Sequence, residues 1–277
     1  ARGGGKSWAV RVKAVLLCYR YPGINVMIVR KTYPELIANH IKPLCEWLHC
    51  YAPDGKDRAA TYNDQKKTMV FPNGSQILFR YCDNDKDAER FQGTECDVMY
   101  IDEATHQSEE RMKKLTACVR GVNEYPKQVR YTCNPGGEGH GWVKRLFIDR
   151  DFRGGENPDD YSFIQARVFD NEILTAADSE YVSSLSSLPE RLRRAWLYGE
   201  WDVFEGQFFP EFDTSIHVCA PSAIPNYTKR FVAIDYGFDM LAAILMAVDT
   251  ESNLYAVREL CIPNLTLREA AERISAL

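Results

Sequence analysis

The sequence predicts an α/β protein with a mainly parallel sheet, and two observations carry this prediction. The first is an alternation of apolar, β-branched segments with segments of helical composition over the first 150 residues. The expected strands lie at residues 24–30, 98–101 and 128–133, and the expected helices at residues 6–19, 33–48 and 109–119. Such alternation is typical of parallel sheets covered by helices on both faces. The second is a glycine-rich turn at residues 1–7, which leads straight into the first helical segment.

The remaining segments refine this architecture. Residues 68–81 predict a hairpin, because two apolar runs flank the turn Pro72-Asn73-Gly74. Residues 162–168 predict one more strand and residues 179–197 a helical stretch. A second group of strands is expected at residues 231–235, 242–248 and 254–259. We therefore expect a first domain at residues 1–205, a linker at 206–228, and the start of a second domain at 229–277.

Composition narrows the class of protein. The 277 residues are 45% hydrophobic and 26% charged, which is ordinary for a globular protein of one large or two medium domains. A net charge of -5 does not suggest a nucleic-acid coat, although a local basic patch would still allow DNA binding. The nine cysteines form no CxxC pair and indicate reduced thiols in a cytosolic compartment. No apolar run is long enough for a bilayer span, so we expect no membrane partner.

The glycine-rich turn has the composition of a phosphate-binding loop. Gly3, Gly4 and Gly5 allow backbone N–H groups to turn toward phosphate oxygens, and the helix N-terminus adds partial positive charge. Lys6 would reach the β- and γ-phosphates of ATP, and Ser7 would bind Mg²⁺. The first glycine of the usual GxxxxGK[ST] pattern would precede Ala1. The alternative is a flexible turn followed by a solvated lysine.

A buried strand that ends in two acids strengthens the ATP interpretation. Residues 97–103 read DVMYIDE. Asp102 at the strand tip would hold Mg²⁺ together with Ser7, and Glu103 would polarise the attacking water. A strand that ends in a solvated acidic turn is the alternative. The position of this strand after the glycine loop, in an α/β pattern, favours an ATP site.

The next strand ends in polar residues at Thr132 and Asn134, which are candidate sensors of the γ-phosphate. An ordinary Asn-Pro-Gly-Gly turn explains them equally well. Arg2, Arg90 and Arg120 are candidate cations for the γ-phosphate, and the sequence does not rank them. All five histidines are interpreted as structural, with His106 and His140 near the ATP site by position.

The second strand group carries two further acids at strand ends, Asp235 and Glu259. Adjacent strands would bring them together, and clustered carboxylates can hold the two Mg²⁺ or Mn²⁺ ions of a nuclease. Such a site needs a third or fourth acid, so ordinary strand-end acids remain the favoured alternative on residues alone.

The order of these motifs resembles the large subunit of tailed-phage terminases over nearly the whole chain. No single motif is specific, but their order and spacing are. The matching segments are ARGGGKS at 1–7, RKT at 30–32, NGS at 73–75, ILF at 77–79, FQG at 91–93, YIDEA at 100–104, TCNP at 132–135, GWV at 141–143, DN at 170–171, LYGEW at 197–201 and IDYG at 234–237.

The resemblance implies an ASCE-type P-loop ATPase domain followed by an RNase H-like nuclease domain. Thr132 to Asn134 would couple hydrolysis to movement, and Asp235 and Glu259 would be the first nuclease carboxylates. The family's last nuclease aspartate would lie beyond residue 277, so we expect an incomplete cutting site. The implied partners are double-stranded DNA, a small terminase subunit, a procapsid portal and a homo-oligomeric ring. The implied location is the host cytoplasm during virion assembly, outside the mature virion.

Two other classes remain open. A helicase or remodelling ATPase shares the glycine loop and the acidic strand, but should carry a second ATPase-like domain with arginines. Residues 231–259 carry strand-end acids instead. An ATP-binding regulatory or assembly module without motor function is the other alternative, and hydrolysis lost in Lys6→Ala and Glu103→Ala would argue against it. Basic pairs at residues 66–67, 113–114 and 144–145 are candidate DNA-phosphate contacts, or simply solvated faces.

Overall fold

The computed structural model describes residues 2–52, 57–91, 93–203, 214–225, 228–237, 240–263 and 265–277. The chain forms two compact units, Ala1–Phe208 and Phe209–Leu277. All nine cysteines are free thiols, as the sequence predicts. In the described part of the chain, no helix combines the length and the apolar character needed to span a bilayer.

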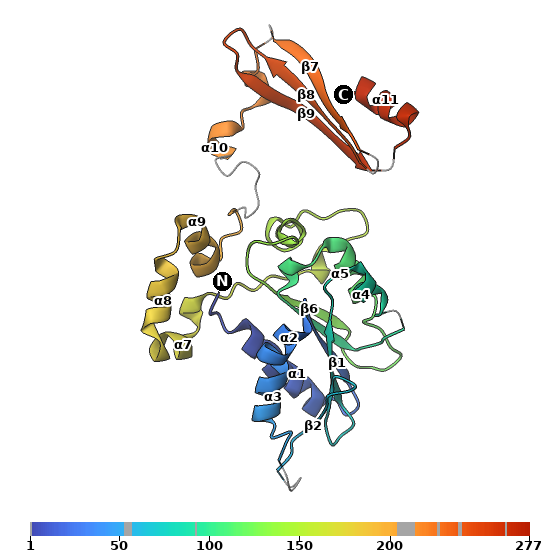
Figure 1. Cartoon of the computed structure of the whole chain (residues 1–277), viewed down its shortest axis with the longest axis vertical. Helices are drawn as coiled ribbons and strands as arrows, with labels where there is room; N and C mark the ends of the chain where they lie inside the picture. Colours follow the sequence, from blue (N-terminus) through green and yellow to red (C-terminus); the bar gives the residue numbers. More distant parts are fainter. Residues whose placement is uncertain are drawn as a thin grey trace. The chain divides into compact units, whose positions relative to one another are not determined.

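The first unit is built on one six-stranded sheet with the order β2-β3-β4-β1-β5-β6 (Figure 1). Its strands are β1 (Asn25–Arg30), β2 (Thr61–Asn63), β3 (Thr68–Val70), β4 (Gln76–Tyr81), β5 (Val98–Asp102) and β6 (Gln128–Thr132). Strands β4, β1, β5 and β6 run parallel, which confirms the mainly parallel sheet. The predicted hairpin is also present, because β3 pairs antiparallel with β4.

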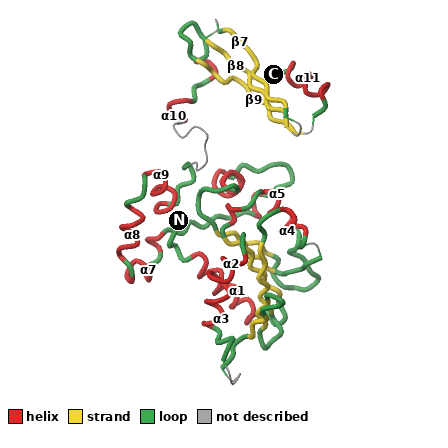
Figure 2. Tube along the Cα trace, in the orientation of Figure 1, coloured by secondary structure: helices red, strands yellow, loops and turns green. Residues whose placement is uncertain are grey.

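Helices cover both faces of this sheet (Figure 2). They include α1 (Lys6–Arg20), α2 (Tyr33–Leu36), the π-helix η1 (Ile37–Ile41), α3 (Lys42–Trp47), α4 (Asp85–Glu89), α5 (Glu109–Thr116), α6 (His140–Val143) and the π-helix η3 (Lys144–Asp149). Alternation along the strands divides the core, since Val26 and Ile28 belong to the cluster that contains residues of α1 and α3. Met27 and Val29 belong to the opposite cluster, which contains residues of α5 and α6.

A third helical group follows, with its own small core around Val168, Leu185 and Leu197. It comprises α7 (Glu172–Ala177), α8 (Ser179–Ser186), α9 (Glu190–Arg193) and the π-helix η6 (Arg194–Tyr198). The strand predicted at residues 162–168 is wrong: residues 162–167 belong to no strand, and a 3-10 turn begins at Val168. This segment runs along the glycine loop instead, where the Ala166 carbonyl oxygen lies 2.9 Å from the position that a Cβ on Gly4 would take.

The second unit contains an antiparallel sheet of β7 (Lys229–Tyr236), β8 (Met240–Val248) and β9 (Leu254–Pro263) in the order β7-β8-β9, followed by α11 (Leu267–Ser275). The short helix α10 (Thr214–His217) precedes it. The expectation that adjacent strands carry Asp235 and Glu259 is wrong, because β8 lies between β7 and β9. The three strands pair in the order in which they follow one another along the chain, which is the commonest arrangement, so the first and third strands are not neighbours.

Candidate active site

The carboxyl ends of three neighbouring parallel strands gather polar side chains at one edge of the first sheet. β1 ends at Arg30, β5 at Asp102 and β6 at Thr132, and the last two are direct register partners. Ligands of open α/β sheets bind outside the carboxyl ends of the strands. A cavity of about 640 Å³ lies here, lined by the glycine loop, Arg30, Glu103, Asn134 and residues of the α7–η6 group.

The glycine loop curls over the N-terminus of α1. Gly3 and Gly5 have φ angles of 74° and 71°, which side chains with a Cβ rarely adopt. Gly5 is the N-cap of α1, and Lys6 and Ser7 begin the helix. All three glycines, Lys6 and Ser7 line the cavity. The positive end of the helix dipole is therefore available to an anion at this point.

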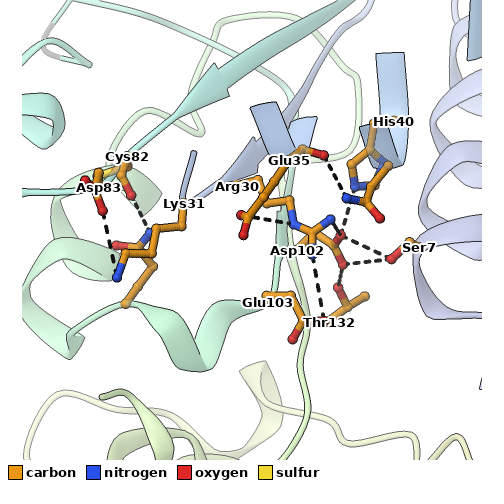
Figure 3. A network of polar contacts seen from close by, with 12 residues as sticks. Ser7, Arg30, Lys31, Glu35, His40, Cys82, Asp83, Asp102, Glu103 and Thr132 are labelled. Carbon is orange, nitrogen blue, oxygen red and sulfur yellow. Dashed lines mark hydrogen bonds and ion pairs between the residues drawn. The ribbon is translucent and has the colours of Figure 1, made fainter. Parts of the chain in front are cut away.

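Asp102 is the centre of a buried polar network (Figure 3). Its carboxylate accepts hydrogen bonds from the Ser7 hydroxyl at 3.1 Å and from the Thr132 hydroxyl, and contacts His40 Nε2 at 2.9 Å. Arg30 Nη1 lies 3.6 Å away. Burial raises the pKa of Asp102, but the His40 and Thr132 hydrogen bonds and the Arg30 charge outweigh it and lower that pKa to about 2. Asp102 is therefore ionised at neutral pH.

A second chain of contacts joins Lys6 to Glu103 through Asn134. Lys6 Nζ donates to Asn134 Oδ1 at 2.9 Å, and Asn134 Nδ2 donates to Glu103 Oε2 at 3.1 Å. Glu103 follows β5 in the left-handed region, with φ 60° and ψ 50°. This conformation is uncommon outside glycine and is concentrated at functional sites. Burial lowers the pKa of Lys6, while the nearby Glu103 charge acts in the opposite direction.

Three side chains near the loop carry no functional role in the sequence-based prediction. Arg30 is 11% exposed, lines the cavity and lies between Asp102 and Glu103. His40 is fully buried against Asp102. Trp196 supports Arg2: the guanidinium carbon lies 3.3 Å from the indole centroid, and the Arg2 N–H donates to the Trp196 carbonyl at 2.8 Å. Position within the RKT segment was the only sequence signal for Arg30.

The other candidate cations lie apart from the cavity lining. Arg90 pairs with Asp87 at 3.1 Å, and Arg120 pairs with Glu95 at 3.0 Å. Arg2 is thus the only one of the three candidate arginines that lines the cavity. His106 also lines it, as its position suggested.

Several members of the basic pairs are neutralised by neighbouring acids. Lys113 pairs with Glu109 at 2.8 Å, and Arg145 pairs with Glu109 and with Glu156. Lys144 pairs with Asp149 at 2.8 Å. For these cations the contacts favour a structural role over a contact to DNA phosphates.

The acids of the second unit are placed less favourably. Asp235 is the register partner of Ala242, and Glu259 of Ile244, so both acids lie on one face of the sheet, two strands apart. Both are exposed. Among the described residues, no three His, Cys, Asp or Glu side chains come close enough to hold a metal ion together. The described acids therefore do not fit a complete two-metal site.

The residues at the end of β5 and the start of α1 do fit a magnesium ion. Mg²⁺ is usually held by one or two carboxylates together with substrate phosphates and water, and does not need an all-protein cage. Asp102 supplies an ionised carboxylate, and Ser7 supplies a hydroxyl beside it at the start of α1. The loop, the acidic strand and the polar end of β6 together define a P-loop nucleotide-binding fold.

Comparison with known proteins places the chain within that class. A family model described as phage terminase large subunit matches residues 1–200. The chain belongs to this family, which confirms the resemblance drawn from the order of its motifs. A comparison with curated protein sequences gave no match.

Solved structures agree with this fold. The large terminase of a thermophilic bacteriophage (crystal form 2) matches with a TM-score of 0.58 and 20% identity over 99% of this chain and 66% of that one. The same protein in complex with ADP matches with a TM-score of 0.58 and 20% identity, over 100% of this chain and 66% of that one. Its complex with ATP-gamma-S matches with a TM-score of 0.55 and 21% identity, again over 100% of this chain and 66% of that one. The chain thus spans 66% of the length of these relatives, slightly under two thirds.

Proposed function

We propose that this chain binds Mg·ATP in the cavity beside the glycine loop and hydrolyses it to drive double-stranded viral DNA into a procapsid. The observation that carries the proposal is the pair of contacts across the site. Ser7 meets Asp102, and Asn134 links Lys6 to Glu103. These residues come from the loop, β5 and the end of β6, and each has the chemistry that phosphoryl transfer to water requires.

Each side chain has a proposed role. Backbone N–H groups of Gly3, Gly4 and Gly5, with Lys6, bind the phosphates. Ser7 and Asp102 would hold Mg²⁺, which supplies positive charge to the phosphate oxygens when bound. Glu103 orients the attacking water and accepts its proton.

The β6 end has a proposed coupling role. A γ-phosphate bound by Lys6 competes with Asn134 for the same ammonium group, since Lys6 Nζ is 2.9 Å from Asn134 Oδ1. Loss of that contact would free Asn134 and alter its hold on Glu103. Thr132 is the register partner of Asp102 and donates to its carboxylate. Both residues would thus report the occupancy of the site to the segment that follows β6.

The wider assembly is proposed on family membership. We propose a homo-oligomeric ring that works with a small terminase subunit and a procapsid portal in the host cytoplasm, outside the mature virion. For the second unit we propose an RNase H-like, Mg²⁺- or Mn²⁺-dependent endonuclease domain. Asp235 and Glu259 share one exposed sheet face, and a cutting site would need further carboxylates beside them.

A Glu103→Gln substitution tests the hydrolytic part. Glutamine keeps the shape and the contact to Asn134 but cannot accept a proton. We expect unchanged nucleotide affinity and a fall in phosphate release of roughly 100-fold or more. Turnover at the wild-type rate would show that Glu103 is not the base. A second assay separates a packaging motor from a helicase. For a packaging motor we expect ATP turnover that DNA stimulates and that is lost when the procapsids cannot accept DNA. For a helicase we expect unwinding of duplex DNA instead.

A further inference from the structure

The imidazole of His40 makes the most completely buried contact to Asp102. His40 has no exposed surface and Asp102 retains only 2%. His40 Nε2 lies 2.9 Å from Asp102 Oδ2 (Figure 3). An ionised carboxylate only accepts hydrogen bonds, so Nε2 carries the proton and donates it. Nδ1 of His40 has no hydrogen-bond partner among the described residues, so Asp102 is the only polar group that this ring serves there.

An unusual backbone places this ring. The helical run that follows β1 changes from α2 to the π-helix η1 (Ile37–Ile41) and back to α3. A π turn accommodates one extra residue, is uncommon, and is frequent at functional sites. Here it buries both His40 and Ile41. The Glu35 carbonyl accepts from Asn39 Nδ2 at 2.9 Å, and Arg11 donates to the Asn39 carbonyl, so side chains bind backbone carbonyls of this segment.

The contacts to Asp102 are divided between its two oxygens. Thr132 donates to Oδ1, while His40 contacts Oδ2 and Arg30 lies beyond hydrogen-bond distance from the same atom. Ser7 lies 3.3 Å from Oδ1 and 3.1 Å from Oδ2, across both. Donors on opposite oxygens fix the rotation of a carboxylate plane. Ser7, which contacts both oxygens, is the second ligand proposed for the magnesium ion.

We propose that His40 is a positioning residue that fixes the Asp102 carboxylate for Mg²⁺, an inference that rests on the proposed Mg·ATP site. His40 does not line the cavity beside the glycine loop. Its effect passes through the orientation of Asp102, in the manner of groups that hydrogen-bond a ligating side chain and typically change metal affinity by about 10- to 100-fold. The π-helix then has a defined purpose, which is to bring a donor to Oδ2.

The test compares two substitutions of similar length in the full chain. His40→Gln retains an amide donor near the position of Nε2, whereas His40→Met fills the space without a donor. The measured quantity is the affinity for a fluorescent ADP analogue, with EDTA and with saturating Mg²⁺, well below the melting temperature. The ratio of the affinity with Mg²⁺ to the affinity with EDTA gives the magnesium-dependent gain in nucleotide affinity. His49→Asn is the matched control, because exposed His49 closes the same helical run with φ 50°, a conformation that asparagine tolerates.

We expect His40→Met to lower the magnesium-dependent gain by roughly 10- to 100-fold, with His40→Gln and His49→Asn within about 3-fold of wild type. Affinity in EDTA should stay within about 2-fold for every variant, because none of these side chains lines the cavity. The inference would be overturned if His40→Met kept the magnesium-dependent increase in affinity of the wild type. It would also be overturned if His40→Met and His40→Gln lost this increase to the same extent. If His40→Met does not fold, His40→Asn, whose amide is too short to reach Oδ2, takes its place under the same criteria. Absence of any magnesium-dependent gain in the wild type would overturn the proposed site and this inference with it.

Discussion

The hydroxyl of Ser7 donates to the carboxylate of Asp102 at 3.1 Å, although 95 positions separate the two residues. The contact joins the first turn of α1 to the end of β5, and it places a neutral ligand and an ionised ligand side by side. Hydrogen bonds to charged groups contribute about 1.5–3 kcal/mol each, so this arrangement is held firmly before any nucleotide is bound.

Asn134→Ala should separate binding from turnover. The substitution frees Lys6 from a competing acceptor, so we expect nucleotide affinity equal to wild type or tighter. Glu103 loses its amide partner, so kcat should fall by about 10- to 100-fold. Steady-state hydrolysis and equilibrium binding measure the two effects. A fall in affinity with unchanged kcat would show that Asn134 contacts the nucleotide instead of holding Glu103.

The stacking of Arg2 on Trp196 predicts an energetic coupling between the loop and η6. Cation–π contacts contribute about 0.5–2 kcal/mol, with the larger values where water is excluded. A double-mutant cycle with Arg2→Gln and Trp196→Leu, measured by urea unfolding, should give a coupling energy of about 1 kcal/mol. Strict additivity of the two substitutions would contradict the contact.

Gly4→Ala tests the close approach of residues 162–167 to the loop. The added Cβ would lie 2.9 Å from the Ala166 carbonyl oxygen, so backbone must shift, at a cost of about 1–3 kcal/mol. Nucleotide affinity should fall as well. Gly141→Ala is the control, because open space surrounds this position in α6 and alanine favours a helix by up to about 1 kcal/mol. Equal stabilities of the two variants, measured by chemical denaturation, would refute the contact.

Acid should remove the stability that Asp102 contributes. Its folded-state pKa of about 2 lies below the ordinary value of 3.8. The contribution is therefore complete above about pH 4 and is lost as pH falls through about 2. The difference in unfolding free energy between wild type and Asp102→Asn should narrow by about 2 kcal/mol between about pH 5 and pH 2. A difference that stays constant over this range would contradict the low pKa.

Local sequence patterns predicted the elements that carry the proposed ATP site. Apolar runs followed by polar residues are local signals, and they identified β1, β5 and β6 together with Asp102, Glu103, Thr132 and Asn134. The parallel pairing that brings these residues together then follows from the α/β class. The comparisons bear out this fold class, while the residue roles remain proposals.

Features that depend on distant pairing were not predictable in the same way. Residues 162–168 have the composition of a strand, yet no strand pairs with residues 162–167, and they lie against the glycine loop instead. The separation of Asp235 from Glu259 is different, because the sequential order β7-β8-β9 is the commonest one for three consecutive strands and could have been expected from the sequence. His40 contacts Asp102 from within a π turn, and a lone histidine in a helical segment gives no sign of that backbone.

The measurement that tests the central claim most directly is a titration of the full chain with a fluorescent ATP analogue in the presence of Mg²⁺, comparing wild type with Lys6→Ala. Lys6 begins α1 beside three loop glycines and lines the cavity, so removal of its ammonium group should weaken binding by at least about 10-fold, equivalent to about 1.4 kcal/mol. Lys13→Ala, further along the same helix, should bind as wild type does. Equal affinities of wild type and Lys6→Ala would contradict a phosphate-binding role for the loop, and with it the nucleotide site.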